Sequence, residues 1–191
     1  MKKMIHQAWI NTEKNSLYLY FGLKKIQFGK LGNNVRINAS ECVFGNSHHI
    51  YIDDDVFIGR GVYMDAASEI HIMSGCMIGP RCVFIGGSHN YNSSDLQSVP
   101  FDRVMNDRPI LFEKNVWIGA NVTVCPGCHI GEGAVIGAGT CIYGDIPAFS
   151  VVVGSSYRII KQRDLSQYSD LVNADAIYNK LFVGQPFILR K

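Results

Sequence analysis

The clearest pattern in the chain is an apolar residue at every sixth position between residues 112 and 142, which read FEKNVWIGANVTVCPGCHIGEGAVIGAGTCI. Two residues before each apolar position from 118 onward stands a small or branched side chain, and glycine directly follows three of the apolar residues. The apolar series is Phe112, Ile118, Val124, Ile130, Ile136 and Ile142, and the small or branched series is Val116, Val122, Cys128, Ala134 and Thr140.

Neither common secondary structure explains a period of six. An amphipathic helix repeats its apolar face at about 3.6 residues, and a half-buried strand alternates at about 2. A period of six fits short strands joined by turns, each strand pointing one side chain into a shared interior, which is the hexapeptide signature of a parallel β-helix. Three such rungs form one coil of roughly 18 residues, and coils stack about 4.8 Å apart. The pattern therefore predicts an all-β fold.

The period divides the chain into three parts. Residues 1–30 lack it, residues 31–163 carry it, and residues 164–191 form a tail whose apolar spacing predicts a short helix across the end of the coil. Within the repeats, slips of one or two residues near 48–51 and near Ile70 are expected at turns between rungs. A polar, non-periodic stretch of about residues 85–109 predicts a loop that protrudes from one corner, where solenoids commonly carry function.

The first thirty residues have two interpretations. The segment Leu17–Phe28 (LYLYFGLKKIQF) is aromatic and is flanked by Lys24 and Lys25. One interpretation is a cap that closes the exposed edge of the first coil. The alternative is an anchor that lies on a membrane surface.

Composition excludes several classes of function. The net charge of +2 gives no electrostatic case for nucleic-acid binding. No apolar run has the 18 or more residues of a membrane span, so no integral membrane segment is expected. The start MKKMIHQAW has no apolar core of a signal peptide, which favours a cytoplasmic protein with reduced thiols.

Six cysteines are scattered through the repeats. Cys76, Cys82 and Cys128 occupy the position two before an apolar rung residue, and we interpret them as small fillers of the interior. Cys125-Pro-Gly-Cys128 has the spacing of a zinc or redox pair, but a second pair is missing, so no metal is expected.

These features resemble the hexapeptide-repeat acyltransferases, specifically the galactoside, maltose and virginiamycin acetyltransferase group and the related polysaccharide O-acetyltransferases. The resemblance covers about residues 31–163, and its most specific part is NVWIGANVTVCPGCHIGEGAVIGAGT, preceded by the loop with GGSH and followed by IPAFSVVVGSSYRIIK. Gly154-Ser-Ser-Tyr157 departs from the G-x-P-A that is usual in the closing segment. The resemblance implies a left-handed β-helix, acetyl-CoA as co-substrate, and a homotrimer with active sites between subunits.

The resemblance and the chemistry of acyl transfer together select His89 as the catalytic base. A hydroxyl attacks an acyl group well only if its proton leaves as the new bond forms, and an imidazole with a pKa near 6.5 accepts that proton at neutral pH. His89 stands where the last rung enters the loop, at the position of the family's catalytic histidine. A histidine that is merely solvated in a loop is the alternative.

The remaining site residues follow from matching the family motif. Gly119 and Ala120, after W-I-G, are candidates for the backbone N–H that stabilises the oxyanion. Trp117 is expected beside the acceptor or the pantetheine arm, or else packed against the loop, and Ala120 and Ala138 beside that arm, where small side chains leave room. The cations available for the coenzyme phosphates are Arg158, Lys161 and Arg163. Acceptor-binding candidates are Asp65, Asn90, Tyr91 and Trp117.

The sequence thus predicts transfer of an acetyl group from acetyl-CoA to a hydroxyl of a saccharide or sugar nucleotide, in a ternary complex. An N-acetyltransferase acting on an amino sugar or antibiotic is the alternative within acyl transfer. Two other classes stay open. One is a metal enzyme of the γ-carbonic-anhydrase type, for which His71 and His89, 18 residues apart, would have to lie one above the other. The other is a non-catalytic scaffold.

Overall fold

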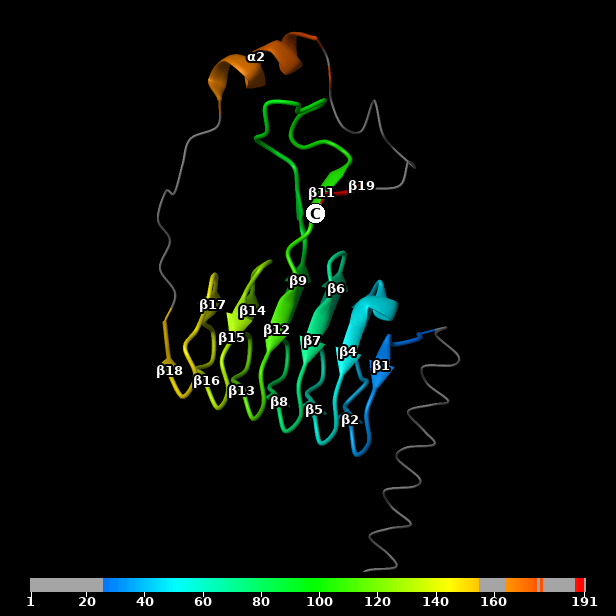
Figure 1. The fold of residues 1–191 in the computed structure, drawn as a ribbon, viewed down its shortest axis with the longest axis vertical. Coiled ribbons are helices and arrows are strands. Elements are labelled where there is room, and N and C mark those ends of the chain that lie inside the picture. The colour runs from blue at the N-terminus through cyan, green and yellow to red at the C-terminus, as the bar shows by residue number, and fades with distance from the viewer. Residues whose placement is uncertain (1–25, 155–163, 175, 177–187, 191) are drawn as a thin grey trace, which may run out of the picture.

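The computed structural model describes residues 26–154, 164–174, 176 and 188–190. The main body is a parallel β-helix whose short strands stack into three sheets (Figure 1). Sheet A contains β1 (Lys30–Leu31), β4 (Ile50–Ile52), β7 (Ile70–Ile72), β12 (Ile110–Phe112) and β15 (His129–Ile130). Sheet B contains β2 (Arg36–Ile37), β5 (Phe57–Ile58), β8 (Met77–Ile78), β13 (Trp117–Ile118), β16 (Val135–Ile136) and β18 (Val151–Val152). Sheet C contains β3 (Val43–Gly45), β6 (Tyr63–Ala66), β9 (Val83–Gly86), β14 (Thr123–Val124) and β17 (Cys141–Ile142).

The chain visits the sheets in the order A, B, C and then returns to A, so each circuit is one coil. In each of these three sheets, neighbouring strands are parallel and belong to successive coils. The prediction of stacked six-residue rungs is therefore confirmed.

The interior is built from the two series of residues that the period selects. Every member of the apolar series is at most 3% exposed, and so is every member of the small or branched series. Cys128 of the second series, and Cys76 and Cys82 at the equivalent position of an earlier coil, fill the interior as predicted. Each thiol donates to a main-chain carbonyl of the next coil: Cys76 to Glu113 O, Cys82 to Gly119 O and Cys128 to Ile142 O. Burial raises the pKa of the Cys76 and Cys128 thiols to about 11, so these residues are inert structural thiols.

The glycines at the corner between sheets B and C have a packing reason of their own. A Cβ at Gly79 would lie 2.7 Å from the carbonyl carbon of Gly119, and a Cβ at Gly119 would lie 2.7 Å from the backbone N of Ala138. Backbones of successive coils are thus in direct contact at this corner. Small residues recur here because the coils stack, which is a sufficient reason before any coenzyme is considered.

The longer irregularities of the repeat lie at the corner between sheets C and A, whereas the first coil has one extra residue between sheets B and C, where the buried Phe44 follows the buried Ile37 by seven positions. In the first coil this corner holds the 3-10 helix η1 (Ser47–His49), and in the second it holds the turn between Ala66 and Ile70. In the third it holds the long excursion between Gly86 and Ile110, which projects away from the coil (Figure 1). The slips and the protruding loop are therefore features of one corner, as predicted for insertions between rungs.

The excursion carries a small sheet of its own, sheet D. It is formed by β10 (Ser88–His89), the antiparallel β11 (Val104–Asn106), and β19 (Ile188–Arg190) from the C-terminal tail, which is parallel to β11. The predicted tail helix is α2 (Leu165–Asn173). We expected it across the end of the coil, but the described residues of the tail contact the excursion: Gln167 donates to Ser93 O, and Val99 N donates to Ala176 O.

At the N-terminal end, Phe28 packs edge-on against Phe44 of the first coil, with ring centroids 5.1 Å apart. The proposed cap, its membrane-anchor alternative and most of residues 1–30 lie outside the described residues. Within those that are described, the structure contains no helix with the length and hydrophobicity of a membrane span.

Candidate active site

His89 lies on β10, at the point where the excursion leaves the coil. Its backbone pairs with Met105 of β11, and its carbonyl accepts a 3.4 Å hydrogen bond from the Asn106 side chain. The ring stacks on Phe101, with centroids 4.1 Å apart and planes at 18°. The candidate base is thus held by a two-stranded ribbon and by an aromatic neighbour.

The surroundings of His89 favour the neutral imidazole that a base requires. Partial burial lowers the pKa of His89 below its ordinary value of 6.5, while the negative charges of Asp65 and Asp102 oppose that change. Burial is the larger effect, so the ring is mostly unprotonated at neutral pH.

Asp102 is the structural centre of the excursion. Its side chain is fully buried, and its carboxylate accepts hydrogen bonds from Asn90 Nδ2 at 2.8 Å, Val104 N at 2.8 Å and Gln97 N at 3.3 Å. These contacts hold both legs of the excursion together, one carrying His89 and the other leading into β11. Asn90 is itself only 3% exposed, and its amide is committed to Asp102, which favours a structural part for Asn90 rather than direct contact with an acceptor.

The C-terminal tail braces the same loop. β19 pairs with β11 along three residues, and Arg190 makes a 2.7 Å ion pair with Asp95. Asp164 N also donates to the Asn92 side chain at 3.2 Å. This pairing was not predictable from the sequence, because β19 is only three residues long and its partner strand lies more than eighty residues away.

Asp65 reaches the corner from the coil beside β9. Asp65 lies on β6, in register with Gly45 of the preceding coil and with Ile85 of the next coil. Ile85 precedes His89 by four residues. Its Oδ1 accepts a 3.1 Å hydrogen bond from Asn46 Nδ2. Asn46 was not selected from the sequence. Recognising that the early coils are 20 residues long, from the spacing of Ile50 and Ile70, would have placed it beside Asp65.

Gly119, Ala120 and Ala138 lie at a different corner, where sheet B passes into sheet C. Gly119 and Ala120 follow β13, Ala138 follows β16, and Asn121 N donates to Pro80 O of the preceding coil. Trp117 on β13 is 58% exposed on the outside of sheet B. These residues are brought together with one another, but sheet C separates them from His89.

The width of that separation follows from the strands. Pro80 lies at the same B–C corner one coil earlier, where its carbonyl accepts a hydrogen bond from Asn121 N. From Pro80 the chain runs along the whole of β9 before it reaches His89 at the C–A corner. The extended part alone spans on the order of 10 Å at about 3.3 Å per residue. His89 and Ala120 of one chain are therefore too far apart to act on one acetyl group.

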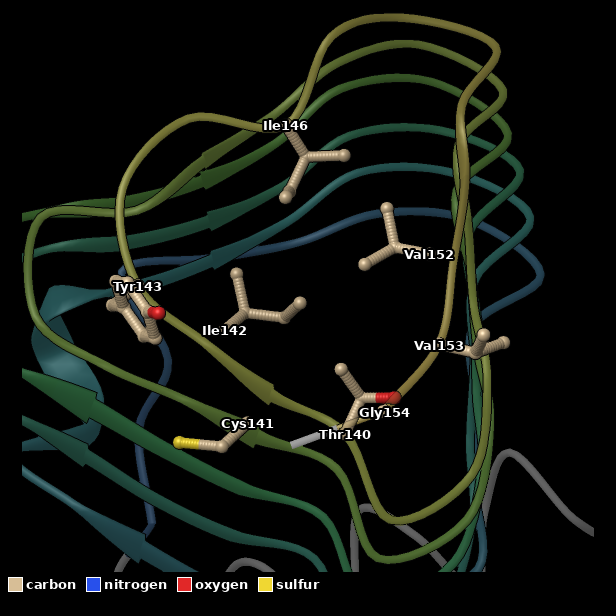
Figure 2. Close-up of a pocket in the computed structure, with 8 residues that line it drawn as sticks. All are labelled: Thr140, Cys141, Ile142, Tyr143, Ile146, Val152, Val153 and Gly154. Atoms are coloured by element: carbon tan, nitrogen blue, oxygen red, sulfur yellow. The ribbon is translucent and has the colours of Figure 1, made fainter. Parts of the chain in front are cut away.

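The C-terminal end of the coil contains a pocket of about 490 Å3. Figure 2 shows Ile142, Ile146 and Val152 pointing into the interior of the last coil, while Tyr143 and Val153 line its rim. The last strand of the coil, β18, ends at Val152, and the described residues of this part of the chain end at Gly154. The predicted phosphate-binding residues Arg158, Lys161 and Arg163 therefore lie outside the described part of the chain.

The two histidines of the alternative metal site lie apart in the structure. His71 lies on sheet A, in register with Tyr51 and Leu111, and stacks on Tyr51 with ring centroids 4.6 Å apart. His89 lies on sheet D, so the two histidines are not one above the other, because the coil at this point is longer than 18 residues. Among the described residues, no group of three or more His, Cys, Asp or Glu side chains is arranged to hold a metal ion.

Comparison with known proteins agrees with this geometry. The model of the bacterial transferase hexapeptide, which comprises six repeats, matches residues 110–144. A protein of Escherichia coli K12 with the provisional name lipopolysaccharide biosynthesis O-acetyl transferase WbbJ is 34% identical over 120 residues, which are 59% of this chain and 60% of that protein. The chain therefore spans about three fifths of that relative's length.

Two solved structures share the fold. A hexapeptide-repeat acetyltransferase of Vibrio cholerae superimposes with a TM-score of 0.64 at 29% identity, over 78% of this chain and 80% of that one. A maltose O-acetyltransferase of Clostridium difficile superimposes with a TM-score of 0.59 at 25% identity, over 72% and 71%. The fold is thus the left-handed parallel β-helix expected from the sequence. The chain carries the hexapeptide repeat of the bacterial transferases and resembles, in sequence and in fold, the acetyltransferases that are built on it.

Proposed function

We propose that this protein transfers an acetyl group from acetyl-CoA to a hydroxyl of a saccharide. The observation that carries the proposal is the position of His89, which leaves a hexapeptide coil on a braced hairpin with its ring kept neutral by burial. The names of the similar proteins, an O-acetyl transferase of lipopolysaccharide biosynthesis and a maltose O-acetyltransferase, support a sugar hydroxyl as acceptor.

In the proposed reaction, His89 accepts the proton of the attacking hydroxyl as the oxygen bonds to the thioester carbonyl carbon. The tetrahedral intermediate carries a negative oxygen, for which the backbone N–H of Gly119 or Ala120 is the proposed donor. Collapse breaks the carbon–sulfur bond, and the coenzyme thiolate takes the proton back from the His89 imidazolium. Since no cysteine lies within the excursion, direct transfer is favoured over an acetyl-cysteine intermediate.

The proposed site requires a second copy of the chain. His89 stands at the C–A corner and Ala120 at the B–C corner, with sheet C between them. A neighbouring subunit that presents its B–C corner to the excursion would complete the site, and the homotrimer implied by the family resemblance does this. Light scattering should give three times the 21.2 kDa chain mass. A monomer with full activity would contradict the shared site.

For the coenzyme, we propose that Trp117, Ala120 and Ala138 flank the pantetheine arm along sheet B. The exposed Trp117 ring offers an apolar surface there, and the close stacking of Gly119 on Ala138 leaves a smooth corner without side chains. Arg158, Lys161 and Arg163 would then provide cations for the phosphates from the segment that follows the last coil.

For the acceptor, we propose that Asp65, Tyr91 and Trp117 approach the sugar. Asp65 acts on His89 electrostatically, and Tyr91 is 41% exposed on the excursion. Burial of Asn90 makes it a support for the loop in this proposal. We place the reaction in the cytoplasm, in keeping with six free cysteines.

The experiment is a screen of sugars, sugar nucleotides, oligosaccharides and amino sugars with acetyl-CoA, in which released thiol is measured and the product is identified by mass spectrometry. We expect a hydroxyl-acetylated saccharide with the wild type and little release with His89→Ala. If amino sugars alone react and the product is an amide, the protein is an N-acetyltransferase and the proposed O-acetyl transfer is wrong. Thiol release that is unaffected by His89→Ala would refute the mechanism.

A further inference from the structure

We propose that Asn46 is a positioning residue of the active site, whose side-chain amide holds the carboxylate of Asp65 in place beside His89. The inference rests on the proposed function, because it concerns the base of that reaction. It also adds a residue that neither the motif nor the family resemblance selects.

The first support is local geometry. Asn46 follows β3 and adopts a left-handed backbone, with φ 51° and ψ 43°, as the residue before η1. This conformation directs the chain away from sheet C, while Asn46 Nδ2 donates to Asp65 Oδ1 at 3.1 Å. Gly45 makes room for the contact, since a Cβ there would lie only 3.1 Å from the same oxygen.

The second support is the place of Asp65 relative to the excursion. Ala66, the next residue, is in register with Gly86, where the excursion begins. Gly87 lies over the turn that follows β6, because a Cβ on Gly87 would touch Ala67 and Ser68. Arg108, on the returning leg, donates from its backbone N to Ser68 Oγ at 2.8 Å. Asp65 therefore sits at the base of the hairpin that carries the proposed catalytic histidine.

The charged groups at this corner leave a specific part for Asp65. Asp102, from the excursion, already accepts hydrogen bonds from three donors, which hold its carboxylate in place. From η1, the His49 ring contacts Ala66 O at 3.0 Å, and on the sheet A side Glu69 pairs with His71 at 2.8 Å. In the part of the chain that the structure describes, Asn46 is the donor to the Asp65 carboxylate.

A carboxylate held in one orientation can stabilise the transition state of the proposed reaction. When His89 takes the proton of the attacking hydroxyl, it becomes a cation, and a fixed negative charge nearby stabilises that cation in the transition state. Asp65 already raises the pKa of His89 against the effect of burial. A carboxylate that rotates freely would provide less of this stabilisation, because its charge would spend time turned toward solvent.

The same coil provides a matched control. Asn34 Nδ2 donates to Asp55 Oδ1 at 2.6 Å, also between the first and second coils, and Asn34 is also left-handed, with φ 53°. This pair lies at the corner between sheets A and B, away from the excursion. Glycine accepts the left-handed conformation without strain, so Asn46→Gly and Asn34→Gly each remove one amide and keep the backbone.

The experiment measures the pH dependence of kcat/KM for thiol release and, separately, the pKa of His89 by NMR in protein with labelled histidine. Asn46→Gly should lower kcat by roughly tenfold, the low end for losing an orienting partner of a functional residue. It should also move the acid limb and the NMR titration to lower pH, because the imidazolium loses stabilisation. Asn46→Asp, which brings a further negative charge to the corner, should move the titration to higher pH. Asn34→Gly should change neither.

A wild-type kcat and an unmoved His89 titration in Asn46→Gly would overturn the proposal, and so would equal changes in Asn34→Gly. The NMR titration does not depend on acetyl transfer. If no acceptor is acetylated but the titration moves as expected, the proposed function fails while the positioning of Asp65 by Asn46 stands.

Discussion

Replacing Asp102 by alanine should loosen the excursion without unfolding the coil. The change removes a fully buried carboxylate and leaves Asn90 Nδ2 and Val104 N, both 2.8 Å from it, without their acceptor. Hydrogen bonds to a charged group contribute about 1.5–3 kcal/mol each. The lower value applies because the variant also avoids burying a charge, so two bonds give about 3 kcal/mol, or roughly a 100-fold rise in the local opening constant.

Amide hydrogen exchange measures that opening directly. The Asn90 backbone N–H, which donates to Val104 O at 2.9 Å, should exchange roughly 100-fold faster in Asp102→Ala. The Trp117 N–H, which donates to Ala134 O within the coil, should be unchanged. As a control, Asp54→Ala removes an exposed aspartate that binds Asn33 N and should affect neither. Equal acceleration at both amides, or none at Asn90, would refute this account of the loop.

Three further predictions concern the base, the core and the tail. Because burial lowers the pKa of His89 and the neutral ring is the base, kcat/KM should rise with pH through an inflection below 6.5, and an inflection above 6.5 would contradict the assignment. Phe84→Ala, at a fully buried ring 4.8 Å from Phe112, should cost about 3–5 kcal/mol in a denaturant titration, whereas Met77→Ala, at a half-exposed side chain, should cost less than about 0.5. Deleting residues 188–191 removes β19 and the Arg190–Asp95 ion pair, so it should reduce kcat and leave the Tm of the coil unchanged; a large fall in Tm would show that the tail supports the coil.

Between residues 112 and 142 the core of the coil was predictable residue by residue, because a period of six leaves little choice; in the first coil one extra residue buries Phe44 in place of Val43. Each rung must bury its apolar residue and the small residue two before it, and both series are buried as expected. The same logic identified Cys76, Cys82 and Cys128 as interior fillers. The excursion and its corner were also predictable, because loss of the period marks where the chain leaves the stack.

The site was less predictable because it depends on the length of each coil. A uniform 18-residue coil would have placed His71 next to His89, whereas His71 pairs with Tyr51, 20 residues earlier, and the two histidines lie on different sheets. The same difference in coil length is why a uniform 18-residue period does not place Asn46 next to Asp65. An insertion of only two residues in a coil changes which side chains of successive coils lie in register.

The contacts of the loop and tail were beyond reach for a different reason. The stacking of Phe101 on His89 and the pairing of β19 with β11 are long-range contacts in segments without a period. The apolar spacing of the tail predicted a helix, which α2 confirms, but not the surface that the helix region contacts. Local pattern determines an element, whereas its partner is decided by the whole fold.

The central claim is that His89 is the base of acetyl transfer, and the most direct test is the rate of His89→Ala with the acceptor found in the screen. The proposed mechanism predicts that kcat falls by about 10²–10⁴-fold, the range for removal of a general base. The KM for acetyl-CoA should stay close to the wild-type value, because the proposed coenzyme residues lie at the other corner of the coil. A kcat within about threefold of the wild type would contradict the claim, since a general base contributes at least about a hundredfold.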